Sequence, residues 1–170
     1  MGETAKGTGS PPGETAKGSG SPPGETAKGS GSPPGETAKG TGSPPRQRVW
    51  SGSPWEPVVG FCRAIRVGNR VIVAGTAPVP PAGEPIADSA YEQMFRCGTI
   101  ALAAMAKLGA SAGDVVRTRM YVTDATDAEA VGRAHQKLFG EASPVATMVV
   151  VAGLLDPAWK VEIEVEAVAE

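Results

Sequence analysis

Four tandem copies of an 11-residue unit fill residues 2–45 and restrict any folded core of this 170-residue chain to the residues after them. The copies span 2–12, 13–23, 24–34 and 35–45, and each reads Gly-Glu-Thr-Ala-Lys-Gly-Thr/Ser-Gly-Ser-Pro-Pro. Each unit offers one alanine for burial, which cannot offset the about 1–2 kcal/mol per residue that ordering a backbone costs. We therefore expect a disordered tail over 1–45, with a tether or partner-binding motif as the alternative, and one domain over 46–170.

Charge and cysteine content narrow the classes of function. The net charge is −2 and both signs are scattered, so the chain offers no basic surface for nucleic acid or for a membrane. No apolar run reaches the roughly 18–20 residues that span a bilayer, and the N-terminus lacks the apolar core of a secretory signal. Cytoplasm is the expected location. Cys62 and Cys97 have no C-x-x-C or histidine partner nearby, so we expect no metal site and interpret both as small buried hydrophobes.

From residue 46 onward, hydrophobic periodicity and turn signals predict an α+β domain. Ser89-x-x-Glu92 and Thr126-x-x-Glu129 are typical capping boxes at helix starts, and Gly109 and Gly140 are typical stops. The predicted order is strand 58–66, a Gly68-Asn69 turn, strand 71–74, a Pro78–Pro85 loop, helix 89–108, strand 115–122, a helix ending near Phe139, and strands 147–151 and 161–169. This order favours a mixed sheet with two helices on one face.

The last predicted strand has two chemically different faces. Val161, Ile163 and Val165 alternate with Glu162, Glu164 and Glu166. Three carboxylates on one face need water, cations or a polar cleft, so the strand is either a solvated edge or part of a subunit interface lined with polar pockets.

Two other predicted strands also indicate how the sheet is covered. In strand 115–122, the side chains of Val116, Thr118, Met120 and Val122 should share one face, opposite Arg117, Arg119 and Tyr121. The consecutive valines 149–151 predict a strand covered on both sides.

Five ordered segments resemble the Rid family (YjgF/RidA, reactive intermediate deaminase-like). They are 59–69 with 71–78, 109–124, 134–140, 143–151 and 155–164. The resemblance implies a chorismate-mutase-like α+β fold, the Rid/YjgF fold, and a homotrimer with clefts between subunits. It also implies hydrolysis of enamines or imines to 2-keto acids and ammonia without a cofactor.

The resemblance also implies site residues. The family's substrate-binding arginine, two residues after a proline, is replaced here by Ala146, and a cysteine two positions later by Met148. Phe61 stands for a tyrosine, and Gly75 follows an alanine where the family has serine. An asparagine on the second helix corresponds to Gly132. The terminal glutamate corresponds to Glu162 when counted from Pro144 and to Glu164 when counted from the C-terminus.

Two further residues are candidates for the same site. Arg63 lies two residues after Phe61 and should share its face, so it is either a substitute cation for the cleft or an exposed hairpin arginine. His135, the only histidine, is either a base that titrates near neutral pH or a residue flanking the apolar side of its helix.

Two functions remain open. The first is an enamine or imine hydrolase whose substrate lacks an essential carboxylate or is held by Arg63. The alternative is a non-catalytic trimer whose clefts bind a small metabolite. The near-neutral charge and the lack of a histidine pair argue against a ribonuclease.

Overall fold

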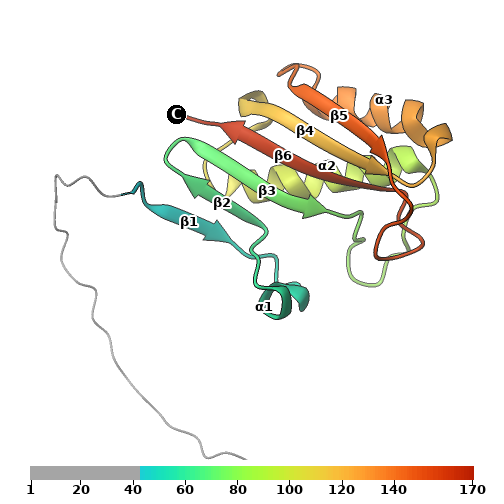
Figure 1. Cartoon of the computed structure of the whole chain (residues 1–170), viewed down its shortest axis with the longest axis horizontal. Coiled ribbons are helices and arrows are strands. Elements are labelled where there is room, and N and C mark those ends of the chain that lie inside the picture. The colour runs from blue at the N-terminus through green and yellow to red at the C-terminus, as the bar shows by residue number, and fades with distance from the viewer. Residues whose placement is uncertain (1–42) are drawn as a thin grey trace, which may run out of the picture. The chain divides into compact units, whose positions relative to one another are not determined.

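The computed structural model describes residues 43–170, which build one mixed six-stranded sheet in the order β1-β2-β3-β6-β4-β5. The two long helices cover one face of it (Figure 1), which confirms the predicted α+β architecture. The strands are β1 (Arg46–Val49), β2 (Ala64–Val67), β3 (Arg70–Thr76), β4 (Val115–Val122), β5 (Val145–Val150) and β6 (Val161–Val168). The helices are α1 (Trp55–Val59), α2 (Ala90–Ala106) and α3 (Ala128–Phe139), with 3-10 turns η1 (Ala112–Asp114) and η2 (Ala125–Asp127). The predicted tail falls outside the described residues, apart from its last three.

The segment before β2 differs from the prediction. Residues 58–66 were expected to be one strand, but Trp55–Val59 form the short helix α1 and β2 begins only at Ala64. The Glu56 carboxylate accepts hydrogen bonds from the Ser51 amide (2.8 Å), the Ser51 hydroxyl (2.8 Å) and the Gly52 amide (3.1 Å). The Ser51 amide in particular holds the pKa of Glu56 below its usual range. Gly60, at φ 82°, then ends the helix.

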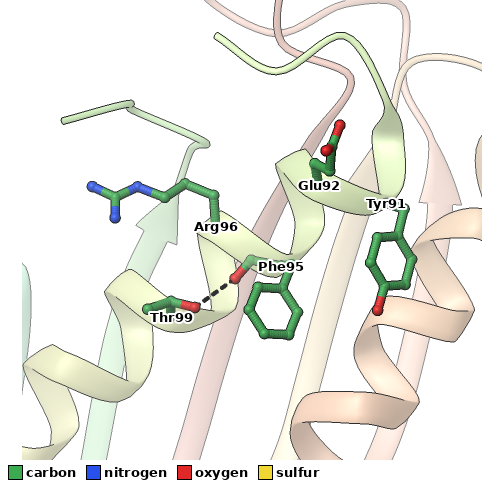
Figure 2. Close-up of a pocket in the computed structure, with 5 residues that line it drawn as sticks. All are labelled: Tyr91, Glu92, Phe95, Arg96 and Thr99. Carbon is green, nitrogen blue, oxygen red and sulfur yellow. Dashed lines mark hydrogen bonds between the residues drawn. The ribbon is translucent and has the colours of Figure 1, made fainter. Parts of the chain in front are cut away.

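Helix α2 begins where its sequence predicted. The Ser89 hydroxyl accepts a hydrogen bond from the Glu92 amide at 3.2 Å, and Gly109 adopts φ 74° just beyond the helix end, a conformation that favours glycine. On its outer side, Tyr91 and Phe95 stack with ring centroids 6.4 Å apart beside a shallow hollow (Figure 2).

Helix α3 begins differently from the prediction. The Thr126 hydroxyl does not cap it. Instead the Asp124 carboxylate accepts from the Thr126 amide at 2.8 Å and caps η2, and α3 follows from Ala128. The helix ends at Phe139 with Gly140 as its C-cap, as expected.

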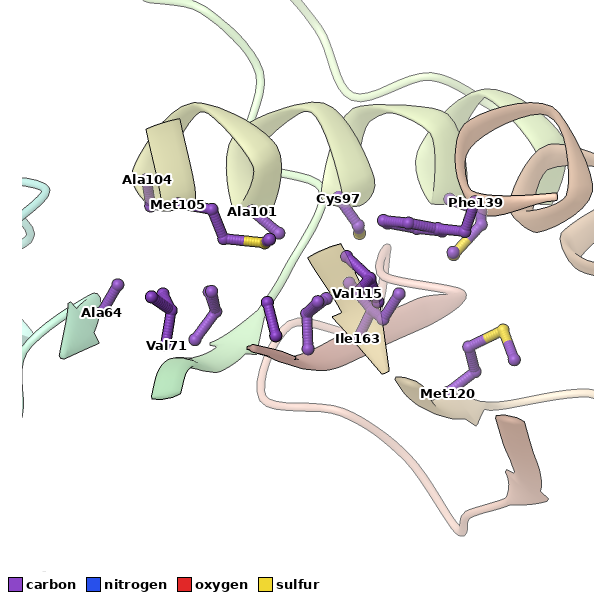
Figure 3. Close-up of a cluster of buried hydrophobic side chains, with 14 of the residues drawn as sticks. Ala64, Val71, Cys97, Ala101, Ala104, Met105, Val115, Met120, Phe139 and Ile163 are labelled. Carbon is purple, nitrogen blue, oxygen red and sulfur yellow. The ribbon is translucent and has the colours of Figure 1, made fainter. Parts of the chain in front are cut away.

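The hydrophobic core lies between the helices and the sheet (Figure 3). Phe139, Met94, Met105 and Cys97 project into it from the helices and are fully buried. Burial raises the pKa of the Cys97 thiol, which fits its predicted role as a small hydrophobe. Cys62 is only half-buried, so that interpretation holds for one cysteine of the two.

Strand β6 lies in the middle of the sheet, between β3 and β4, so the solvated-edge interpretation of its glutamates is wrong. Its predicted alternation is confirmed, because Val161, Ile163 and Val165 are all buried against the helices. The expected face pattern of β4 fails at Val116, which is exposed while Val115 is buried. A register shift between Val115 and Arg117 accounts for the difference.

Strand β5 is an edge strand that pairs only with β4, in parallel. Val145, Val149 and Val150 are 66%, 43% and 59% exposed. The predicted coverage of this strand on both sides is therefore absent within one chain. No helix in the described range 43–170 is long and apolar enough to cross a membrane.

Phe139 and Phe95 should contribute very differently to the free energy of unfolding. Phe139→Ala should lower the free energy of unfolding by about 3–5 kcal/mol, because it empties a fully buried site. Phe95→Ala is the matched control, since Phe95 is 39% exposed, and it should cost much less. Urea denaturation measures both values, and equal losses would contradict this description of the core.

Candidate functional site

The side chain of Glu162 lies on the sheet face opposite the helices and packs directly against Gly75. A Cβ atom added at Gly75 would overlap Oε1 of Glu162 and lie 3.2 Å from its Cδ. Gly75 belongs to β3, next to β6, where the register shifts between Val73 and Thr76. The missing side chain at position 75 therefore makes the room that the Glu162 carboxylate occupies.

The surroundings of Glu162 favour its protonated form. Burial raises the pKa of this half-buried carboxyl, the Arg63 guanidinium opposes the rise, and the nearby Glu164 adds to it. Tyr121 is the register partner of Glu162 on β4, and burial together with Glu164 raises the pKa of this phenol. A carboxyl whose pKa lies closer to neutrality than usual is suited to exchanging protons with a ligand.

Arg63 lies beside Gly75, as the sequence suggested, but it is half-buried rather than exposed. Its Nη1 donates to the carbonyl of Gly75 at 2.5 Å, to the hydroxyl of Thr76 at 3.0 Å and to the carbonyl of Ala74 at 3.5 Å. The guanidinium carbon lies 5.8 Å from the centre of the Phe61 ring. Phe61 and Arg63 precede β2 rather than belonging to a strand, so the shared-strand argument was wrong although the two residues are close.

Glu164 and Glu166 differ from Glu162 because each forms an ion pair with an arginine. Nη1 of Arg119 lies 3.2 Å from a Glu164 oxygen and 3.3 Å from a Glu166 oxygen. Arg70 approaches Glu166 at 3.2 Å. Within residues 43–170, Glu162 has no ion pair of this kind. Of the two candidate glutamates, Glu162 is the one placed with Gly75 and Arg63.

Ala146 and Met148 lie apart from this group within one chain. Both belong to β5, which is separated from β6 by β4. Their register partners are Thr118 and Met120, whose side chains are buried toward the helices, and Met148 packs against the core. Within one chain, these two positions do not reach Glu162.

Within one chain, His135 lies on the helix-covered side of the sheet, opposite Glu162. Its Nε2 is 2.8 Å from the hydroxyl of Thr118, which is fully buried on the helix-covered face. The ring packs against Phe139 at 5.1 Å between centroids, and burial lowers the pKa of the imidazole. These contacts support the alternative that His135 flanks the apolar side of α3, and within one chain they do not bring it to Glu162.

Two neighbours of the site were not identified as such from the sequence, namely Arg119 and Tyr121. Alternation along β4 placed them on a common face, but only the strand order shows that this face adjoins the glutamates of β6. The hollow over α2 lies on the outer side of that helix (Figure 2), and Glu162 is not among the residues that line it. The described residues contain no group of three or more His, Cys, Asp or Glu side chains arranged to hold a metal.

The family model described as Endoribonuclease L-PSP matches residues 52–169, and the chain belongs to this family, known also as the Rid, RutC or YjgF family.

The region shared with known relatives makes up most of the length of each relative. An uncharacterized protein of Streptomyces coelicolor is 43% identical over 71% of this chain and 90% of its own. A 2-iminobutanoate/2-iminopropanoate deaminase of Escherichia coli is 31% identical over 64% and 85% of the two chains. The crystal structure of a YjgF/YER057c/UK114 family member from Mycobacterium tuberculosis superposes with a TM-score of 0.68 at 39% identity, over 74% of this chain and all of that one.

The contact between Gly75 and Glu162 predicts that two glycine-to-alanine changes have opposite effects on stability. Gly75→Ala should displace the Glu162 side chain and lower the free energy of unfolding by about 1–3 kcal/mol, because the new methyl group overlaps the carboxylate. Gly132→Ala is the control. Nothing lies within 4 Å of its added Cβ in α3, and alanine favours a helix by up to about 1 kcal/mol. Thermal denaturation shows whether each variant is more or less stable than the parent. A Gly75→Ala protein as stable as the parent would contradict the contact.

Proposed function

We propose that this protein hydrolyses a reactive enamine or imine to a carbonyl compound and ammonia, at a site centred on Glu162. The observation behind the proposal is the half-buried Glu162 carboxylate, which forms no ion pair within residues 43–170 and rests on Gly75 beside Arg63 and Phe61. The 31% identity to a deaminase named for 2-iminobutanoate and 2-iminopropanoate supports the reaction class.

The reaction needs only a water molecule and a group that can exchange protons. The protonated imine is the reacting form. Glu162 accepts one proton from water as the water oxygen attacks the imine carbon, and a neutral carbinolamine forms. Glu162 then gives this proton to the nitrogen, the C–N bond breaks as the hydroxyl proton passes to bulk water, and the carbonyl compound and ammonia leave. No oxidant or reductant enters the balance. A carboxyl with a raised pKa suits both transfers, because it binds a proton more readily than an ordinary carboxylate does and can still release it.

We further propose that the protein is a homotrimer with the sites at its subunit boundaries. The valines exposed on edge strand β5 and the half-covered sheet face support burial against a second copy. The placement of Ala146 and Met148 on β5, away from Glu162 in one chain, fits a cleft shared by two subunits.

Light scattering should give three times the chain mass of 17.2 kDa. A monomer mass would overturn this assembly.

The second candidate function is a non-catalytic trimer that binds a small metabolite. One observation favours it: position 146 holds alanine, so the arginine of the family's fully active members is missing. In that case Glu162 would bind a neutral or cationic ligand rather than move protons.

Removal of the Glu162 carboxylate discriminates between the two functions. Imines released by an amino-acid oxidase or amine oxidase are trapped as semicarbazones, and the protein should suppress this trapping by hydrolysing them first. Glu162→Gln should lower the rate of imine hydrolysis, read from this suppression, about 100-fold or more, because the amide cannot accept the proton. Glu129→Gln is the control, since Glu129 is an exposed residue of α3 paired with Arg133, and should have no effect.

The acid limb of the pH–rate profile gives a second test of the same role. Glu162 must be ionised to accept a proton, so the rate should fall as pH drops through its pKa, which lies above the ordinary 4.5. No suppression with any imine, together with thermal stabilisation by a neutral metabolite, would reject the hydrolase and support the binding protein.

A further inference from the structure

The guanidinium of Arg63 is already engaged by the protein backbone. Nη1 donates to the carbonyls of Ala74 and Gly75 and to the hydroxyl of Thr76, and the Thr76 hydroxyl donates in turn to the Ala74 carbonyl at 2.8 Å. Nε is buried and has no partner within the described residues. Only Nη2 is left for a molecule arriving from solvent.

This arrangement prevents Arg63 from replacing the missing arginine at position 146. An arginine recognises a carboxylate through two parallel N–H groups on one edge of the guanidinium. One edge pairs Nη2 with Nε, which solvent does not reach. The other pairs Nη2 with Nη1, which is occupied by three acceptors. A ligand carboxylate could therefore form a single hydrogen bond with Arg63 and no more.

The contacts of Arg63 give it a different task. They converge on residues 74–76, where the register of β3 against β6 shifts, and Gly75 in this segment is the surface on which Glu162 rests. The charge of Arg63 acts on two carboxylates, Glu56 and Glu162. One side chain thus fixes the backbone below Glu162 and supplies a positive charge that acts on the Glu162 carboxylate.

We propose that Arg63 is a positioning residue for Gly75 and Glu162 rather than a substrate anchor, and that the substrates of this protein are imines or enamines without a carboxylate group. The second half of this inference rests on the proposed hydrolase function. Arg119, another cation on the same sheet face, supports it because its Nη1 is already shared by Glu164 and Glu166.

A matched pair of imines tests the substrate class. The imines of phenylglycine and benzylamine, released by a flavin amino-acid oxidase and a flavin amine oxidase, differ only in the carboxylate. The protein should hydrolyse the benzylamine imine at least as fast as the phenylglycine imine, judged by suppressed semicarbazone formation. A preference for the phenylglycine imine of about 10-fold or more would match an intact charge-assisted contact to the carboxylate and would overturn the inference.

Substitutions at Arg63 test the positioning role with a readout that does not depend on activity. The 13C shift of the Glu162 carboxyl is titrated in the parent, in Arg63→Met and in Arg63→Lys. Arg63→Met should raise the Glu162 titration midpoint, because Arg63 opposes the effects of burial and of Glu164. Arg63→Lys retains the charge and should restore most of the parent midpoint. The other ionisable neighbours, Glu164 and Tyr121, are unchanged throughout.

Arg66→Met is the matched control, because Arg66 also donates to backbone carbonyls, those of Gly68, Leu108 and Ala169. It should reduce stability without moving the Glu162 midpoint. In the activity assay, Arg63→Met should slow both imines by a similar factor. Loss confined to the phenylglycine imine would make Arg63 a carboxylate anchor and reject the proposal.

The two proposals fail in different ways. If neither imine is hydrolysed, the hydrolase function and the substrate class fall together, while the Glu162 titration still decides the role of Arg63. If hydrolysis occurs but Arg63→Met leaves the Glu162 midpoint and both rates unchanged, the positioning role is wrong and the hydrolase stands.

Discussion

The central position of β6 is the constraint on which the rest of the domain depends. Because β6 pairs with β3 on one side and β4 on the other, its backbone groups are satisfied within the sheet and its side chains must alternate between two environments. Val161, Ile163 and Val165 anchor the helices on one face. The same alternation places Glu162 and Glu164 on the opposite face, so core formation and the position of the site follow from one strand.

Features with a local physical cause could be predicted from the sequence. The Ser89 cap, the stop at Gly109 and the two faces of β6 each depend on residues close together in the chain. Predictions failed where a distant or competing contact decided the outcome. The Glu56 carboxylate, held by the amides of residues 51 and 52, stabilises a turn of helix where hydrophobicity suggested a strand. A register shift at β4, which periodicity does not reveal, exposes Val116.

The candidate site was predictable in its parts but not in its arrangement. The sequence identified Phe61, Arg63, Gly75 and one of two glutamates, and the fold brings these residues together around Glu162. Strand order, which the sequence left open, separates Ala146 from that group within one chain. It also places His135 across the sheet, where the fully buried Thr118 hydroxyl and the Phe139 ring account for its contacts.

The charges around Glu162 determine what kind of molecule can enter. A ligand carboxylate would lose hydration beside Glu162 and Glu164, two groups of its own sign, and desolvating an ion is costly unless it is fully paired. Arg63 could return one charge-assisted hydrogen bond, worth about 1.5–3 kcal/mol, instead of two. The missing bond alone corresponds to about a 10- to 150-fold loss of affinity. A neutral imine incurs neither cost, and a protonated imine is attracted to the Glu162 carboxylate. The geometry that weakens binding of an imino acid therefore favours an imine without the acid group.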